Sequence, residues 1–203
     1  PKLPFSFLRV PVIAYNMVVT SGGVCLRREL AFLEQLVTKP LLHAWLEEDY
    51  IGTPRLINVT YRTSHNSVHH LYHLVRFYHR TRYQVARSQV IVEWGGGYGN
   101  LAKIFRRWQP SSYTYIIIDT PLFTCLQWLY LSVVLGSDRV HLLQHSFDDV
   151  RVGKVNLLPV SFIEQVKLPP ADLFISTWAL SESSLAAQDY VWRCRWFGAN
   201  HLL

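Results

Sequence analysis

The chain has only three cysteines, and their placement excludes the usual cysteine-based sites. Cys25, Cys125 and Cys194 are odd in number, lie far apart and never form a C-x-x-C spacing. A disulfide framework needs an even set, and a structural zinc site needs closely spaced pairs. We therefore expect neither a disulfide scaffold nor a metal site, and we expect a reducing cytoplasm as the location.

Long apolar runs are also lacking. The most apolar stretch, residues 115–135, is interrupted by Asp119, Pro121 and Gln127. A membrane-spanning helix needs roughly 18 or more consecutive apolar residues. We therefore expect no membrane span.

Acidic residues are outnumbered by basic ones. The 14 Asp and Glu residues stand against 20 Lys and Arg residues, which gives a net charge of +6. Such an excess favours anionic partners such as nucleic acid or anionic glycans. The more common alternative is a solvated helix face, and we expect it here because most of the excess lies in clusters on predicted helices: Arg76, Arg80, Arg82, Arg87, Lys103, Arg106 and Arg107.

The sequence is rich enough in apolar residues to bury one substantial core, since half of its 203 residues are hydrophobic. Leucines recur every three or four residues over 26–36 and again over 41–46, with Pro40 as a break between them. These patterns predict an N-terminal helical cap over residues 1–60. Residues 61–203 are expected to form the second domain.

A different pattern begins with a helix that Ser64 or Asn66 would cap and that reaches Tyr78. From residue 89 short β-branched strands alternate with helices, as is typical of a parallel α/β sheet. The expected strands are 90–92, 113–118, 155–159 (with 140–143 as a competitor), 173–177 and 199–203, and the expected helices are 100–108, 121–135 and 188–196.

A glycine-rich segment, residues 95–99, separates strand 90–92 from helix 100–108. Glycines at such a turn let a nucleotide approach the backbone amides and the positive end of the helix. Asp119 ends the next strand, where it can accept hydrogen bonds from ribose hydroxyls. A turn without a ligand is the alternative, but four glycines in five residues each cost backbone entropy. We therefore expect nucleotide binding.

The spacing of this segment discriminates between nucleotides. A dinucleotide fingerprint needs G-x-G-x-x-G, but Asn100 stands where the third glycine should fall. The segment instead reads acidic-x-G-x-G-x-G, with Glu93 followed by Gly95, Gly97 and Gly99. A carboxylate at that place suits the cationic amino group of a methionine moiety and would repel a pyrophosphate. The spacing therefore predicts S-adenosylmethionine as the cofactor.

Three blocks of the sequence resemble a family of sugar O-methyltransferases from bacterial surface-glycan gene clusters. They are residues 92–102 (VEWGGGYGNLA), 117–121 (IIDTP) and 172–183 (DLFISTWALSES). The resemblance extends over roughly residues 50–203. It implies a class I (Rossmann-like) methyltransferase fold, S-adenosylmethionine as cofactor and a sugar hydroxyl as acceptor. Trp94 departs from the family pattern, in which a smaller aliphatic residue is usual.

Carried over to the matching positions, the resemblance implies cofactor contacts from four segments. The implied contacts are Gly95 and Gly97 with the methionine and ribose, Asp119 and Thr120 with the ribose, Ser161 or Phe162 with the adenine, and Thr177 with the methionine end.

Methyl transfer to a hydroxyl requires a base that removes its proton. His69 and His73 share one helix face and are candidates, as is Glu182 beyond strand 173–177. The alternatives are a half-buried helix face for the histidines and a helix N-terminal carboxylate for Glu182. No third ligand accompanies the histidines, so no metal is expected. The choice of base stays open.

Taken together, the sequence predicts a mostly parallel, Rossmann-like α/β domain that transfers a methyl group from S-adenosylmethionine to a hydroxyl of a sugar or glycan precursor. One alternative is a methyltransferase acting on RNA or another anionic substrate, since Trp and Tyr are available for base stacking. Another is a non-catalytic domain that has kept the nucleotide-binding fold. A class I sheet normally has seven strands, so we also expect this chain to be a fragment without the last of them.

Overall fold

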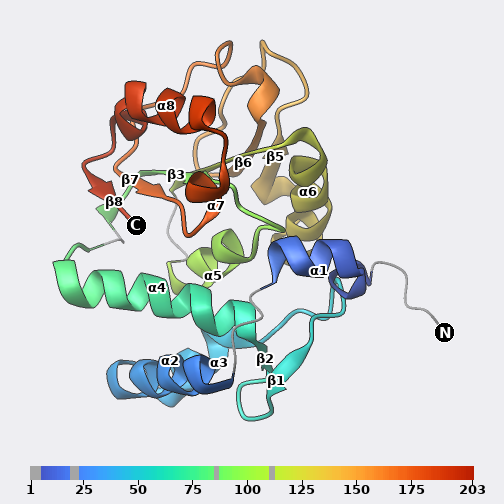
Figure 1. Ribbon diagram of the computed structural model, residues 1–203, viewed down its shortest axis with the longest axis vertical. Helices are drawn as coiled ribbons and strands as arrows, with labels where there is room; N and C mark the ends of the chain where they lie inside the picture. Colours follow the sequence, from blue (N-terminus) through green and yellow to red (C-terminus); the bar gives the residue numbers. More distant parts are fainter. Residues whose placement is uncertain (1–5, 19–22, 85–86, 110–112) are drawn as a thin grey trace. The chain divides into compact units, whose positions relative to one another are not determined.

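The computed structural model describes residues 6–18, 23–84, 87–109 and 113–203 (Figure 1). The chain divides into two compact units, one of residues 1–83 with 103–110 and the other of residues 84–102 with 111–203. Every helix within the described residues is too short or too polar to cross a bilayer. The expected functional division at residue 60 stays a prediction.

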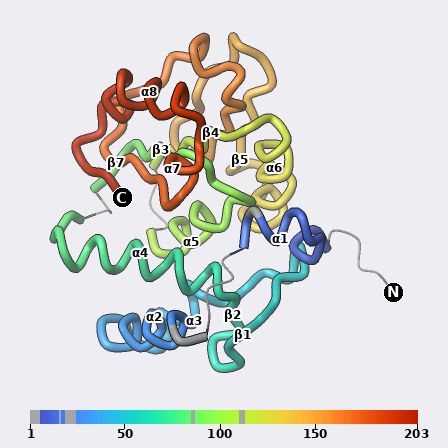
Figure 2. The backbone as a smooth tube through the Cα atoms, viewed as in Figure 1, coloured from blue at the N-terminus to red at the C-terminus, as the bar shows by residue number. Residues whose placement is uncertain are grey.

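The first unit is mainly helical, and its backbone path can be followed in Figure 2. Its elements are η1 (Phe7–Arg9), α1 (Pro11–Met17), α2 (Gly23–Leu36), α3 (Lys39–Leu46), the strands β1 (Leu56–Asn58) and β2 (Thr63–Ser64), and α4 (His65–Thr81). The predicted helices at 26–36 and 41–46 are confirmed. Pro40 lies in the first turn of α3, where its missing N–H costs nothing. The short antiparallel pair of β1 and β2 was not predicted.

Helix α4 begins where the sequence predicts. The Ser64 side chain accepts a hydrogen bond from the Ser67 backbone N–H at 3.2 Å, so Ser64 is the N-cap and Asn66 lies inside the helix. The apolar stripe, which includes Val68, Leu71 and Leu74, is buried and α4 packs against α2.

The second unit is built on a six-stranded sheet in which every pairing is parallel. In spatial order the strands are β5 (Val140–Leu142), β6 (Val155–Pro159), β4 (Thr114–Asp119), β3 (Val90–Trp94), β7 (Leu173–Ile175) and β8 (His201–Leu202). The helical segments are the first turn of α5 (Asn100–Trp108), α6 (Pro121–Leu135), η3 (Ser137–Arg139), η4 (Val160–Phe162), α7 (Ala179–Glu182), α8 (Leu185–Arg193) and η5 (Arg195–Gly198).

The fold class predicted from the sequence, a mostly parallel Rossmann-like sheet flanked by helices with further helices at the N-terminus, is confirmed. Both candidates for the third strand form, because β6 pairs with β4 and β5 takes the edge beside β6. Strand β4 is buried along its whole length and α6 packs on β4, β5 and β6.

The strand order determines where a ligand can bind. From β3 the chain proceeds through β4 to β6 on one side of the sheet, and it then returns to place β7 and β8 on the other side of β3. Strands β3 and β7 therefore flank the topological switch point. In open parallel sheets the crevice at the carboxyl ends of such strands is the usual ligand site.

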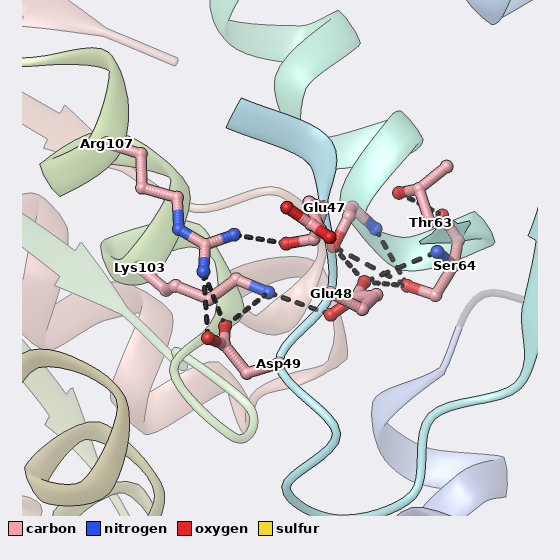
Figure 3. Close-up of polar contacts among 8 residues, drawn as sticks. Glu47, Glu48, Asp49, Thr63, Ser64, Lys103 and Arg107 are labelled. Atoms are coloured by element: carbon pink, nitrogen blue, oxygen red, sulfur yellow. Dashed lines mark hydrogen bonds and ion pairs between the residues drawn. The ribbon is translucent and has the colours of Figure 1, made fainter. Parts of the chain in front are cut away.

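A buried ionic network in the first unit corrects one expectation (Figure 3). The Lys103 ammonium is fully buried, 2.9 Å from Glu48 Oε2, and Arg107 Nη2 contacts both carboxylate oxygens of Asp49 at 2.9 and 2.7 Å. Ser64 Oγ donates to Glu48 Oε1 at 2.5 Å. The expectation of a solvated face is therefore wrong for Lys103 and Arg107, because the helix pattern alone does not reveal partners in a distant loop.

Candidate functional site

The glycine loop between β3 and α5 has a left-handed backbone at three positions, a conformation that favours glycine. Gly95, Gly97 and Gly99 have φ values of 74°, 56° and 92°, in the left-handed region. The Gly95 N–H donates to the Ile118 carbonyl at 2.9 Å, which ties the loop to the end of β4. The tight turn is thus specified by the residues that the sequence marked.

The glycines differ in what surrounds them. A Cβ at Gly95 would lie 2.1 Å from Ala179 Cβ, and one at Gly99 would lie 2.8 Å from Leu131 Cδ1. A side chain at either position would therefore clash with its neighbours. A Cβ at Gly97 would meet none of the described atoms within 4 Å. The loop therefore has an open backbone face at Gly97.

Asp119 at the end of β4 is held toward this loop. Its Oδ1 accepts the Thr120 N–H at 2.7 Å, and its Oδ2 accepts Gln127 Nε2 at 2.8 Å. The amides of Gly96 and Gly97 also donate to the carboxylate. Asp119 and the loop thus form one hydrogen-bonded unit, as the sequence predicted from two separate motifs.

Glu93, the last residue but one of β3, is 4% exposed, and its Oε2 accepts the Tyr115 hydroxyl at 2.9 Å. Burial, with a smaller contribution from the charge of Asp119, raises the pKa of Glu93 to about 8. Burial also raises the pKa of Asp119 to about 6, although its hydrogen bonds oppose this. Because the two carboxyl groups are buried close together, ionisation of one makes ionisation of the other less favourable. A bound cation would make the ionisation of both more favourable.

Gln127 and Tyr115 are site residues that the sequence analysis missed. Gln127 on α6 is fully buried, and its Nε2 donates to both Asp119 and the Gly97 carbonyl, the latter at 2.9 Å. Its Oε1 has no hydrogen-bond partner among the described residues. The sequence feature that could have indicated Gln127 is its position as a lone amide side chain in the most apolar stretch of the chain, residues 115–135.

Trp94, at the end of β3, has contacts that fit its size. Its indole N–H donates to Ser183 Oγ at 3.0 Å, and its ring stacks on Phe197 with centroids 6.4 Å apart. Ser176 Oγ donates to the Trp94 carbonyl at 3.3 Å, so the ends of β3 and β7 are joined. Thr177 follows directly and is half-buried at this edge.

The predicted adenine contacts lie at the end of β6. Ser161 is exposed in η4, and Phe162 is half-buried against the hydrophobic core of the second unit. Their contact with a ligand stays a prediction. Phe162 thus also contributes to the core, which its sequence position alone did not indicate.

Glu182 is exposed and is the last residue of α7, whose N-cap is Trp178. Because α7 has a single turn, the carboxylate still lies within the first turn of the helix. Its assignment as a base stays a prediction.

His69 and His73 belong to the first unit, where they form a chain with a buried glutamate. His69 Nδ1 lies 2.5 Å from Glu29 Oε1, and His69 Nε2 lies 2.8 Å from His73 Nε2. If Glu29 accepts the Nδ1 proton, His69 Nε2 accepts from His73. Burial, with the nearby charges of His69 and Arg76, lowers the pKa of His73 to about 4. Glu29 was not found from the sequence.

The structure thus brings Glu93, Gly97 and Asp119 together at the switch point of the sheet, and it places His69 and His73 in the other compact unit. Across the described ranges, no group of three or more His, Cys, Asp or Glu side chains is arranged to hold a metal ion.

Comparison with known proteins gives structural likenesses only. No family model matches the chain, and no curated protein matches it. Similar solved structures include mitomycin 7-O-methyltransferase MmcR, with 18% identity and a TM-score of 0.37 over 50% of this chain. Another is PigF with SAH, with 13% identity and a TM-score of 0.44 over 62% of this chain. The matches span 25% and 32% of the lengths of those two chains.

Proposed function

We propose that this chain is a class I methyltransferase domain that binds S-adenosylmethionine at residues 93–99 and Asp119 and methylates a hydroxyl of a sugar or glycan precursor. The observation that carries the proposal is the pair of buried carboxyl groups, Glu93 and Asp119, around a glycine loop that is open at Gly97. This pair lies at the switch point of a parallel sheet.

The charge of the site favours this cofactor over a dinucleotide. S-adenosylmethionine carries an ammonium and a sulfonium, and either cation would stabilise the ionised forms of Glu93 and Asp119. A pyrophosphate would instead make the ionisation of both carboxyl groups still less favourable. The unpartnered Gln127 Oε1 fits a site that a polar ligand completes.

When bound, S-adenosylmethionine supplies an electrophilic methyl group. The residues of the chain have to orient the acceptor hydroxyl and take up its proton. Glu182 is one candidate for this role. His69 and His73 are the others, because their lowered pKa values keep both imidazoles neutral at pH 7. Three sequence blocks that resemble sugar O-methyltransferases support the choice of a sugar hydroxyl as acceptor.

The cofactor assignment is tested by calorimetric titration with S-adenosylhomocysteine and, separately, with NADH. We expect the wild type to bind S-adenosylhomocysteine and not NADH. Asp119→Asn should weaken binding by about tenfold or more, since a buried charged acceptor to the ribose is lost. Asp138→Asn, at an exposed aspartate, is the matched control.

Equal affinity of Asp119→Asn and wild type would contradict the assignment of Asp119. The absence of binding to S-adenosylhomocysteine would instead support a non-catalytic domain. For the base, we expect Glu182→Gln or His73→Gln to lower turnover without changing the affinity for S-adenosylhomocysteine. Unchanged turnover at saturating acceptor would eliminate the residue concerned.

A further inference from the structure

A cavity of about 680 Å³ lies beside the ends of β7 and β8 in the second unit, a size that suits a small molecule. Its walls come from the residues after β7, from α7 and α8, and from η5, all of which lie near the end of the chain in Figure 1. Three of the seven tryptophans of the chain line it, namely Trp178, Trp192 and Trp196. Aromatic side chains are typical of the walls of small-molecule sites.

A strained turn orients one of these rings. Arg195, Trp196 and Phe197 follow one another with φ values of 48°, 54° and 57°. Left-handed conformations are unfavourable for bulky residues, and they persist mainly where the surroundings enforce them, often at functional sites. Phe197 stacks on Phe174 in the core with centroids 6.1 Å apart, while Trp196 lines the cavity. Both rings contact the core, since Trp196 meets Phe174 edge to face with centroids 5.5 Å apart, but of the two only Trp196 lines the cavity.

The other two tryptophans that line the cavity, Trp192 and Trp178, are partly exposed to solvent. Trp192 is 67% exposed and meets Trp196 edge to face, with centroids 6.0 Å apart. Trp178 is 42% exposed. Exposed indole surface beside polar groups is suited to a ligand that has both an apolar face and hydroxyls. A pyranose ring has this character, because its axial C–H bonds form apolar faces and its hydroxyls point outward.

Polar side chains beside the rings are held in place. Gln188 Nε2 donates to the Ser183 carbonyl at 2.9 Å, which directs the amide. Asp189 Oδ2 accepts from Arg193 Nε at 2.9 Å. Both Gln188 and Asp189 line the cavity. A carboxylate and an amide oriented in this way are suitable acceptors for sugar hydroxyls.

An adjacent hollow adds positive charge. It measures about 320 Å³ and is lined by Trp192, Arg193, Arg195 and Trp196, so it shares two indoles with the larger cavity. Arg193 is paired with Asp189, and Arg195 adds a second cation at this wall. Two guanidinium groups favour a carboxylate or phosphate.

We propose that these two hollows bind an acidic saccharide. The sugar ring packs on Trp192 and Trp196, its hydroxyls face Gln188 and Asp189, and its carboxylate or phosphate contacts the arginines. Identifying this saccharide as the methyl acceptor rests on the proposed function. Thr177 supports that link, because it lines the cavity and also follows the strand end joined to Trp94.

The proposal is tested by titrating the chain with D-glucuronate, D-glucose 6-phosphate and D-glucose, using calorimetry and saturation-transfer NMR of the ring protons. We expect at least one of the two anionic sugars to bind about fivefold or more tightly than glucose. Glucuronate distinguishes a carboxylate site from a phosphate site, because the two anions differ only at the group on C6.

Two variants separate the ring contact from the charge contact. Trp192→Ala should lower the binding affinity for both anionic sugars and for glucose by roughly tenfold. Trp128→Ala, at another partly exposed tryptophan, should leave these affinities unchanged. Arg195→Gln should reduce the ratio of the affinity for the anionic sugar to the affinity for glucose by about threefold or more, and it should leave the affinity for glucose unchanged. Arg139→Gln is its exposed control.

Equal affinity for glucose and both anionic sugars would overturn the proposal, and so would binding that is unaffected by Trp192→Ala. A single-stranded RNA oligonucleotide that binds at Trp192 when no sugar does would also overturn it. These results are independent of the cofactor titration. Loss of S-adenosylhomocysteine binding with sugar binding intact would remove only the methyltransferase assignment.

Discussion

At the scale of single residues, burial decides the behaviour of the two acidic residues in the candidate site. Glu93 and Asp119 are near neighbours whose burial makes ionisation less favourable, so each has a pKa well above its ordinary value, about 8 for Glu93 and about 6 for Asp119. Two buried carboxyl groups of this kind lower the stability of the fold at neutral pH, a cost that is common at functional sites. Glu93 is the better probe because its shift is the larger.

Glu93→Gln is expected to stabilise the chain and to weaken S-adenosylhomocysteine binding. The folded-state pKa of Glu93, about 8, exceeds the ordinary value of 4.5. Between these pH values the folded chain holds a proton that the unfolded chain has lost, so the free energy of unfolding of the wild type falls as pH rises, by at most about 1.4 kcal/mol per pH unit. Glutamine removes this dependence and can still accept from Tyr115.

Urea unfolding of wild type and Glu93→Gln between pH 5 and pH 8.5 measures this effect, with Glu164→Gln at an exposed glutamate as the control. The advantage of Glu93→Gln should grow with pH. A variant that is less stable than the wild type at pH 8 would show that ionised Glu93 stabilises the fold.

At the scale of elements, helix α5 connects the glycine loop to the buried ionic network. It begins at Asn100, directly after the loop, and carries Lys103 one turn later. Burial alone would raise the pKa of Glu48, but Lys103 and the hydroxyls of Ser64 and Ser67 together lower it. Glu48 is therefore ionised and fully partnered, and the register of α5 is fixed by a specific pair of charges.

Removal of one partner from this buried pair should destabilise the chain strongly. Lys103→Met leaves Glu48 as a buried, less well compensated charge, at an expected cost of roughly 3–5 kcal/mol in the free energy of unfolding. Arg62→Gln, which removes an exposed partner of Glu47, should cost about 1 kcal/mol or less. In a double-mutant cycle, Lys103→Met with Glu48→Gln should cost less than the sum of the single changes. Additive costs would show that the two charges do not interact.

Helix α4 ends with a residue that is poorly suited to its backbone conformation. Arg82 has a φ of 59° at the C-cap, and its N–H donates to the Tyr78 carbonyl at 2.8 Å. Glycine is the usual residue in this left-handed cap. We expect Arg82→Gly to raise the free energy of unfolding by about 0.5–1 kcal/mol, measured by chemical denaturation. Arg80→Gly, inside α4, is the matched control and should destabilise by a similar amount.

At the scale of the whole molecule, the most strongly shifted imidazoles of the first unit and carboxyl groups of the second act in opposite directions on acidification. In the first, burial lowers the pKa of His70 to about 3 and that of His73 to about 4. Below pH 6.5 the unfolded chain takes up protons that these buried imidazoles do not, so the first unit loses stability on acidification. In the second, Glu93 and Asp119 have raised pKa values, so acidification removes an unfavourable charge.

Hydrogen exchange at pH 7.5 and pH 5, corrected for the intrinsic rate, should therefore show a selective loss of protection in α2 and α4 at the lower pH, while β3 and β4 keep theirs. Glu29 has a raised pKa and partly opposes the loss. His73→Gln, which cannot take up the proton, should show a smaller loss in α4. A uniform change across both units would contradict this division.

Local sequence patterns sufficed for most of the elements and for the placement of the glycine loop beside Asp119. The helix from Asn100 to Trp108, the helix from Pro121 to Leu135 and the strand from Val155 to Pro159 were predicted with the bounds observed. The helical period of 3.6 residues, the continuous β-branched runs, the prolines at helix starts and the glycine spacing are properties of neighbouring residues. The association of the loop with Asp119 was predictable for a similar reason, because the carboxyl ends of adjacent parallel strands meet at one edge of a sheet.

Tertiary structure alone decided which distant residues meet. Lys103 reads as one more basic residue on a helix, and only the fold brings Glu48 to it. Gln127 reads as an interruption of an apolar helix until α6 packs over the loop and Asp119. Local patterns determine which helix or strand each segment forms. The order of strands in the sheet and the packing of helices on it determine which side chains are buried together. Burial then determines whether those side chains are charged.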